Sequence, residues 1–167
     1  NTSPGSSGNQ NFKFVPIERV VGLSGGGPPP DPGTVKMVVA DPSALIAGEI
    51  AIRDRLMNSG YTVSIVDDNA VVASDAIGAA FVFVSSTVGD ATLGAKLRDV
   101  PQPVWIAKPF SFDNMLMTGS VANVDYGNVS TDSITITDTT HPLAAGLAGT
   151  VLVTPANKTK SWGLPGP

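Results

Sequence analysis

The chain has 167 residues, of which 42% are hydrophobic and 14% charged, and its formal net charge is −4. This length allows one core of ordinary size with an appendage, and the scattered basic residues argue against nucleic acid as a partner. The absence of cysteine excludes disulfides, thiolate metal sites and a cysteine nucleophile. No apolar run reaches the roughly 18 residues of a membrane span, so we expect none.

The first 34 residues differ in composition from the rest of the chain. We expect an extended N-terminal arm over residues 1–24 and a linker rich in glycine and proline over residues 25–34. Within the arm, residues 17–21 read as a strand, and Pro16 directly before them suits an edge strand or an isolated pairing. The apolar side chains of the arm that we expect to contact another copy are Phe12, Phe14, Ile17, Val20 and Val21.

Residues 22–26 read GLSGG and match the G-x-S-x-G pattern of serine hydrolases. A nucleophile elbow needs a helix directly after its serine. Three glycines and three prolines occupy residues 25–30 instead, and they exclude a helix there. The single histidine, His141, lies far along the chain. We therefore assign Ser24 to a hinge and not to a catalytic site.

From residue 35 onward, short β-branched runs alternate with helical patterns. The longer helix is expected to start with Asp41 as its N-cap and Pro42 at its first position. This alternation predicts an α/β fold in which an open parallel sheet carries helices on both faces. Trp105 falls in the fourth strand and is predicted to lie in the core. The predicted strands are residues 35–40, 61–66, 79–85 and 103–107, and the predicted helices are residues 42–58 and 87–99, with one helical turn at 73–76.

The part of the chain after Lys108 is predicted to be β-rich. Residues 133–138 alternate as a strand does, residues 141–147 resemble a short helical turn, and residues 149–154 are a further strand. His141 is predicted to be a turn residue whose ring packs or hydrogen-bonds locally. One histidine cannot form a zinc site and the acidic residues lack a calcium-loop pattern, so we expect no metal and no cofactor.

The turns after the predicted strands argue against nucleotide and phosphorelay chemistry. The first turn between a strand and a helix has no glycine to admit a pyrophosphate. A response-regulator receiver domain needs an aspartate after its third strand, where this chain has Ser85, Ser86 and Thr87.

Polar side chains at the carboxyl edge of the predicted sheet are the candidates for a ligand site. Asp41 follows the first strand, Ser85 and Ser86 follow the third, and Lys108 follows the fourth. Open α/β sheets place their ligands at this edge. The serine hydroxyls either cap the next helix or bind a small anion or a sugar, and the sequence leaves both interpretations open.

Three N-x-[ST] sequons begin at Asn1, Asn128 and Asn157. Chance matches are expected in a chain this rich in serine and threonine, so we expect glycosylation only if a glycosylating organism secretes the protein. Few lysines, with abundant Thr, Ser, Gly, Ala and Val, are typical of bacterial or archaeal surface proteins. The composition therefore predicts an extracellular or cell-surface location.

Several stretches together resemble the flavodoxin-like domain of secreted, multidomain bacterial proteins, which is related to the ThuA-like and class I glutamine amidotransferase superfamily. The most specific motif is HPL at residues 141–143, followed by Gly146 and Leu147. The stretches that carry the resemblance are residues 35–71, 79–89, 97–119 and 136–151.

The resemblance implies a flavodoxin-like domain over residues 35–167. Amidotransferases of the superfamily carry a catalytic cysteine in the region that matches residues 85–88, and this chain has none, so that activity is not implied. ThuA-like relatives are often linked to carbohydrate metabolism. Domains of this type continue beyond the SWG at residues 161–163. The resemblance therefore implies either that the chain is truncated or cleaved, or that something else covers the exposed sheet edge and core.

Two functional hypotheses follow. The leading one is a non-catalytic extracellular structural or interaction module, in which residues 12–21 of one copy pair with the incomplete sheet of the next to build a filament or a surface array. The alternative is a carbohydrate- or small-anion-related hydrolase or binding domain that uses Asp41, Ser85, Ser86 and Lys108. A third possibility is one domain of a longer protein, whose other domains would be its partners.

Overall fold

A computed structural model describes residues 32–165, and the arm and most of the linker lie outside this part of the chain. The strands are β1 (Thr34–Val39), β2 (Thr62–Asp67), β3 (Ala79–Val84), β4 (Val104–Ile106), β5 (Tyr126–Thr131), β6 (Ser133–Ile136), β7 (Gly149–Leu152) and β8 (Lys158–Gly163). The helices are α1 (Ala47–Asn58) and α2 (Asp90–Leu93), with short 3-10 turns η1 (Ala73–Ala76), η2 (Pro109–Ser111) and η3 (Pro142–Ala144).

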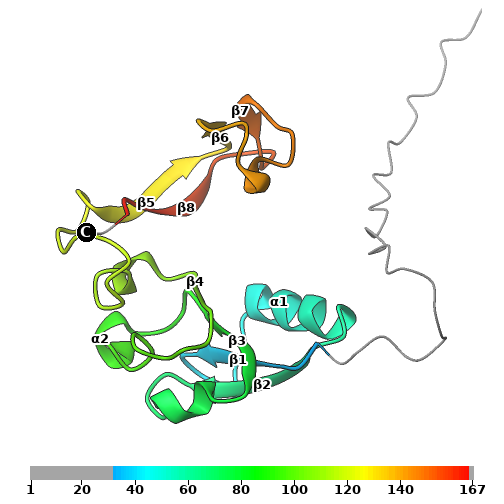
Figure 1. Ribbon diagram of the computed structural model, residues 1–167, viewed down its shortest axis with the longest axis vertical. Coiled ribbons are helices and arrows are strands. Elements are labelled where there is room, and N and C mark those ends of the chain that lie inside the picture. The colour runs from blue at the N-terminus through cyan, green and yellow to red at the C-terminus, as the bar shows by residue number, and fades with distance from the viewer. Residues whose placement is uncertain (1–31, 166–167) are drawn as a thin grey trace, which may run out of the picture. The chain divides into compact units, whose positions relative to one another are not determined.

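The first four strands form one parallel sheet in the order β2-β1-β3-β4 (Figure 1). Strand β1 lies inside the sheet because its run of β-branched and apolar residues is suited to burial on both faces. The predicted α/β class with a parallel sheet and a β-rich C-terminal part is confirmed in these residues. None of the helices in residues 32–165 is long and apolar enough to cross a membrane.

Apolar cores form on both faces of the sheet. Val35, Met37 and Val39 of β1 point to one face, where the α1 residues Ile52 and Leu56 pack against them. Val38 points to the other face and joins a cluster that contains residues of η1 and α2. Helical segments therefore cover both faces, as predicted.

The start of α1 differs from the prediction. Asp41 does not cap the helix, because its Oδ1 accepts hydrogen bonds from the backbone N–H of Ser43 at 2.8 Å and from the Ser43 hydroxyl at 2.6 Å. These bonds close a local turn of the kind that aspartate favours outside helices. The helix begins only at Ala47, where Glu49 reaches back to accept a hydrogen bond from the N–H of Ile46 at 3.0 Å.

The helix predicted over residues 87–99 is also much shorter than expected. Only Asp90–Leu93 is helical, and Gly94 follows with φ of +49°, which is a left-handed backbone conformation. Turns lead from there to residue 99. Leu93 and Leu97 are nevertheless fully buried, so apolar packing holds this segment on the sheet without a continuous helix.

The prediction that Trp105 lies in the core is wrong, because 65% of its surface is exposed. Trp105 is paired with Phe83 across β3 and β4 and contacts that ring edge to face at 5.7 Å. Strand β4 is the end strand of the sheet, and the apolar residues of α1 pack against β1 and β2 instead. Within residues 32–165 the tryptophan therefore has a neighbouring strand on one side only.

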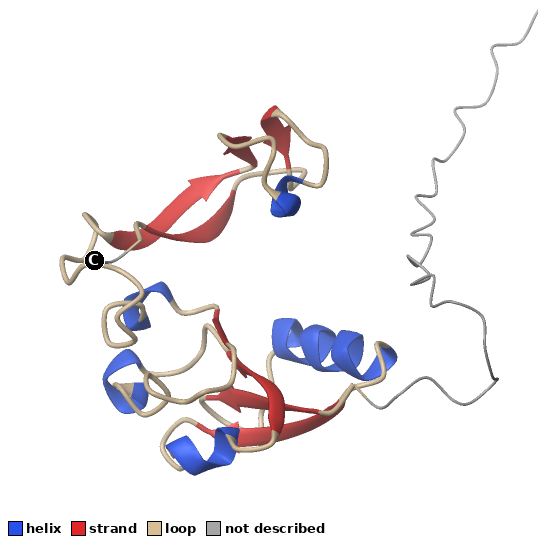
Figure 2. Ribbon diagram, viewed as in Figure 1, coloured by secondary structure: helices blue, strands red, loops and turns tan. Residues whose placement is uncertain are grey.

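The second half of the chain forms two antiparallel ribbons, β5 with β8 and β6 with β7 (Figure 2). The predicted strands near residues 133–138 and 149–154 and the helical turn after His141 are confirmed by β6, β7 and η3. Strands β5 and β8 were not predicted. Their sequences, YGNVST and KTKSWG, are mostly polar and lack the apolar alternation that indicates a strand.

The base of the β5–β8 ribbon is fixed to the segment that follows β4. The buried Tyr126 contacts Phe110 edge to face at 5.9 Å, and the Ser161 hydroxyl donates to the carbonyl of Ala107 at 3.4 Å. Gly163 lies so close to this segment that a Cβ would stand 2.8 Å from Cγ2 of Thr118. These contacts place one face of the ribbon beside the carboxyl edge of the parallel sheet.

Candidate functional site

The structure divides the four residues predicted at the carboxyl edge into two groups. Ser86 and Lys108 line the same pocket, whereas Asp41 and Ser85 do not line it. Asp41 is exposed and bonded to Ser43, and these hydrogen bonds lower the pKa of its carboxyl group. Ser85 is 2% exposed and belongs to a buried network.

The centre of that network is Glu49, which the sequence analysis did not identify. Its side chain is 3% exposed, and Oε1 accepts hydrogen bonds from the hydroxyls of Ser85 and Thr87, each at 2.6 Å. The Thr87 oxygen also accepts from the backbone N–H of Ala40 at 3.3 Å. The network thus joins α1 to the ends of β3 and β1.

The network is built to hold these elements together. Burial raises the pKa of Glu49, but hydrogen bonds from Ser85, Thr87 and the backbone of Ile46 lower it by more, so the net pKa lies below the ordinary value of 4.5. A carboxylate of lowered pKa is a weak base, and the Ser85 proton is already donated to it. The pair therefore lacks the properties of an activated nucleophile.

The pocket at the carboxyl edge has a volume of about 440 Å³, within the range of small-ligand sites. We call it the polar pocket. It is lined by Ser86, Ala107, Lys108, Pro109, Phe110, Asn128, Thr159 and Ser161.

The β5–β8 ribbon provides three of the polar groups in this pocket. Asn128 lies directly opposite Ser161, and Ser130 lies opposite Thr159. Side chains two residues apart share a face of a strand, so these four lie on the same polar face. Thr159 and Ser161 could not be assigned from the sequence because β8 was not recognised, and Asn128 was identified only as a sequon.

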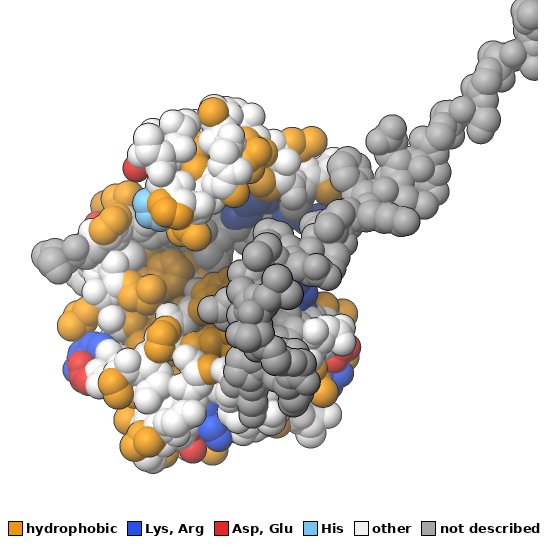
Figure 3. Space-filling model, turned by 45° about the vertical axis from the view of Figure 1, so that its right-hand side comes forward, with side chains coloured by type: hydrophobic (Ala, Val, Ile, Leu, Met, Phe, Trp, Pro, Cys, Tyr) orange, Lys and Arg blue, Asp and Glu red, His pale blue; other side chains and the backbone are white. Residues whose placement is uncertain are grey.

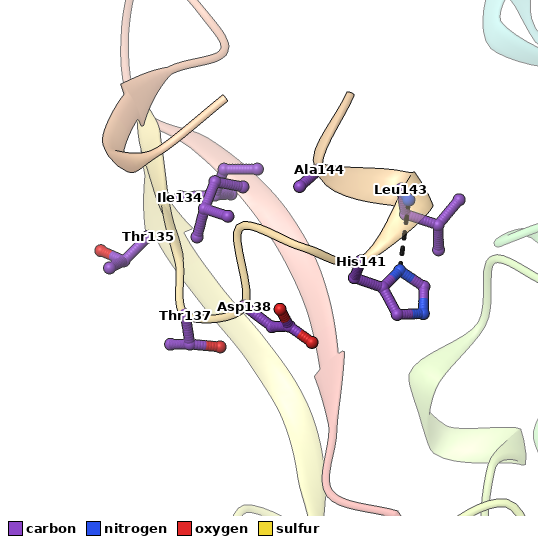
Figure 4. A pocket seen from close by; sticks show the side chains of 8 residues that line it. Ile134, Thr135, Thr137, Asp138, His141, Leu143 and Ala144 are labelled. Carbon is purple, nitrogen blue, oxygen red and sulfur yellow. Dashed lines mark hydrogen bonds between the residues drawn. The ribbon is translucent and has the colours of Figure 1, made fainter. Parts of the chain in front are cut away.

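A second hollow, of about 350 Å³, lies beside η3 and contains the single histidine (Figure 4). His141 Nδ1 accepts a hydrogen bond from the backbone N–H of Leu143 at 3.2 Å, which confirms the predicted local bond. The nearby Asp138 carboxylate accepts from the N–H and the hydroxyl of Thr140 at 2.9 and 2.7 Å, and these bonds lower its pKa. Both side chains therefore stabilise local turns through hydrogen bonds.

Asp68 is the other buried acid near the carboxyl edge, at 3% exposure. Its Oδ2 accepts a hydrogen bond from the N–H of Gly89 at 2.7 Å, which ties the end of β2 to the start of α2. Lys96 donates to the backbone carbonyl of Asp68 at 2.8 Å. Asp68 is thus a structural group, and residues 32–165 contain no cluster of three or more possible metal ligands.

The sequons differ in their surroundings. Asn128 is exposed and lines the polar pocket, so a glycan there would stand at the pocket. Asn157 is exposed in the turn before β8, and Asn1 lies outside the described residues.

No protein-family model matches the chain, and comparison with curated proteins and with solved structures gives no match either. The resemblance to flavodoxin-like and ThuA-like domains therefore stays a prediction.

A mostly apolar hollow of about 410 Å³ lies at the start of β3 and β4 and is lined by Ala80, Phe81, Pro103, Val104 and Trp105. We call it the edge groove. Two backbone hydrogen bonds show which residues at β4 face β3. The N–H of Val82 donates to the carbonyl of Pro103, and the N–H of Ala107 donates to the carbonyl of Val84, both at 2.9 Å. In a parallel pair of strands, alternate residues hydrogen-bond to the neighbouring strand. The backbone N–H and C=O groups of Val104 and Ile106 therefore point away from β3.

Proposed function

We propose that this chain is a non-catalytic interaction module that assembles with other copies of itself outside the cell or at the cell surface. One observation carries the proposal: strand β4 ends the sheet with outward-facing backbone groups and an exposed Trp105 beside the edge groove. A sheet edge of this kind is a template for an added strand. The tryptophan would supply the apolar anchor that such contacts use.

The strand order supports a flavodoxin-like sheet in which one place is open. Flavodoxin-like sheets have the order 2-1-3-4-5, and the described strands occupy the first four of these positions. The fifth position lies beside β4, and within residues 32–165 no strand pairs there. A strand from another molecule would complete the pattern.

Residues 12–21 of the arm are the proposed occupant, and they lie outside the described residues. Their sequence, FKFVPIERVV, has apolar residues on both sides of a single proline. The 12 residues from Gly22 to Gly33 separate this segment from β1 and can extend over at most about 40 Å. Donor and acceptor surfaces differ, so repeated contacts of this kind give an open filament or array.

Composition and side-chain geometry support the other parts of the proposal. The Thr-, Ser-, Gly-, Ala- and Val-rich sequence with few lysines suits a surface protein. Only 14% of the residues are charged, and the face drawn in Figure 3 shows hydrophobic side chains at its surface among charged ones, which favours contact between copies. The non-catalytic assignment rests on Ser85, which is buried and bonded to Glu49.

Deletion of residues 1–21 is expected to abolish assembly. The full chain should show a mass that grows with concentration in light scattering and filaments or arrays in electron microscopy, because each copy carries both donor and acceptor. The deleted chain should stay at the monomer mass and keep its thermal unfolding transition. Equal masses for the two chains across the concentration series would contradict the proposal.

A second candidate function is the binding of a small polar ligand at the carboxyl edge. The observation that favours it is the polar pocket, where Ser86 and Lys108 meet the ribbon residues. This candidate is independent of the edge groove and needs no catalytic step.

A further inference from the structure

We infer that the polar pocket binds a carboxylated sugar, a uronic acid unit, with its carboxylate on Lys108 and its hydroxyl groups on the ribbon side chains. The inference deepens the second candidate function and rests on it. It does not depend on assembly through β4.

The charge in the pocket selects for an anion. Among residues 32–165, Lys108 is the only charged residue in the lining, and no aspartate or glutamate of this part of the chain lines it. The side chain is half-buried, and no hydrogen bond or ion pair joins its ammonium group to any residue between 32 and 165. A partly desolvated cation without a counter-ion favours an anionic partner, because burial of an unpaired charge costs free energy.

The neutral polar groups select for hydroxyls. The Asn128 amide offers donors and an acceptor, and the Thr159 and Ser161 hydroxyls can each donate and accept. Sugar hydroxyls also donate and accept, so each can pair with such a group. Ser86, which follows β3, adds a further hydroxyl to the lining.

The geometry of the pocket lets both kinds of contact form at once. Asn128 and Ser161 are direct cross-strand neighbours, and the Ser161 hydroxyl also contacts the carbonyl of Ala107, the residue before Lys108. The hydroxyl-binding face and the cation therefore lie on adjoining walls. Pro109 and Phe110 add apolar atoms to the lining, and these can contact the C–H groups of a sugar ring.

A single cation distinguishes a carboxylate from a phosphate. One lysine balances the one charge of a uronate, whereas phosphate sites use several cations or convergent backbone N–H groups. Inorganic phosphate is therefore expected to bind more weakly than the uronate.

Titration calorimetry on the full chain tests the inference, with glucuronate, glucose and inorganic phosphate as probes. A glucuronate-containing oligosaccharide is the fourth probe, and it distinguishes binding of a free sugar from binding of a polysaccharide unit. Glucuronate is expected to bind at least about tenfold more tightly than glucose, since a hydrogen bond to a charged group is stronger than a neutral one. Equal binding of the two sugars would overturn the uronate assignment but keep the second candidate function. No binding of any probe up to ~10 mM would overturn both.

Two pairs of variants locate the site. Lys108→Met should weaken glucuronate binding at least about tenfold, whereas Lys158→Met, on the opposite face of the same ribbon, should leave it unchanged. Asn128→Asp adds a carboxylate to the pocket and should abolish binding, whereas Ser130→Asp on the same strand should have a smaller effect because Ser130 does not line the pocket. Asn128 and Ser130 are exposed, so these variants should fold. Unchanged glucuronate binding in Lys108→Met or Asn128→Asp would overturn the inference.

Discussion

Replacement of Glu49 with alanine is expected to lower the free energy of unfolding by about 3 kcal/mol, because it leaves buried hydroxyls without their charged acceptor. Ser85 is 2% exposed and donates to Glu49 at 2.6 Å, as does Thr87. The variant should also loosen α1, since Ile46 loses the acceptor for its N–H. Urea unfolding at neutral pH measures the change.

The control is Asp54→Ala, on the same helix. Asp54 is exposed and, within residues 32–165, forms an ion pair only with its neighbour Arg53 at 2.7 Å, so its removal should change the stability by less than about 0.5 kcal/mol. A loss below about 1 kcal/mol for Glu49→Ala would show that the buried network does not hold α1 in place.

The same carboxylate should contribute to acid unfolding. The pKa of Glu49 is lower in the folded protein than its ordinary value of 4.5, so the folded state binds the proton less readily than the unfolded state. Its stabilising contribution is therefore complete above about pH 4.5 and is lost as the pH falls through the folded pKa. Asp41 and Asp138 also have lowered pKa values, so the contribution of Glu49 appears as the difference in slope between wild type and Glu49→Gln.

The second large effect is expected for Trp105→Lys, which should prevent assembly without unfolding the protein. A charged side chain beside an edge strand opposes the addition of another strand. The concentration at half-assembly should rise by about 30-fold or more, because an aromatic hot spot contributes about 2 kcal/mol or more to an interface. Stability should fall by only about 1 kcal/mol, for the lost contact with Phe83. Sedimentation and thermal unfolding measure the two quantities.

Leu152→Lys is the matched control for this variant. Leu152 is 67% exposed, as Trp105 is 65% exposed, but it lies on β7 in a separate ribbon. A general loss of surface hydrophobicity would affect both variants equally. Assembly that survives in Trp105→Lys, or that fails equally in Leu152→Lys, would contradict the role of the β4 edge.

The parallel sheet was predictable because its signals are local. The runs TVKMVV and AAFVFV are apolar and rich in β-branched and aromatic residues, and such runs lie inside parallel sheets. The turn at His141 was predictable for a similar reason, since its hydrogen bond spans only two residues. The boundaries of the helices were less predictable, because Asp41 can cap a helix or close a turn with the same atoms.

The candidate sites depend on contacts between residues far apart in the sequence. Glu49 meets Ser85 across 36 residues and Thr87 across 38, and no local pattern indicates these partners. The polar pocket needs strand β8, whose sequence KTKSWG does not read as a strand. Pairing with β5 and anchoring through Gly163 override its weak propensity.

Trp105 was predicted to lie in the core, and its exposure is the basis of the proposed contact between copies. An apolar strand interior predicts a buried tryptophan, but 65% of its surface is exposed, and we propose that the arm of another copy covers it. The end position of β4 is the physical reason for the difference.

The contact between the arm and the β4 edge can be measured by cross-linking two single-cysteine variants. The chain has no cysteine of its own, so each variant carries a single thiol. One population carries Glu18→Cys in the arm, and the other carries Pro101→Cys just before β4. A short bis-maleimide can then join the two thiols. The control replaces Pro101→Cys with Asn58→Cys, at the end of α1. We expect covalent dimers in the first mixture at several times the yield of the control. Equal yields in the two mixtures would contradict assembly through the β4 edge.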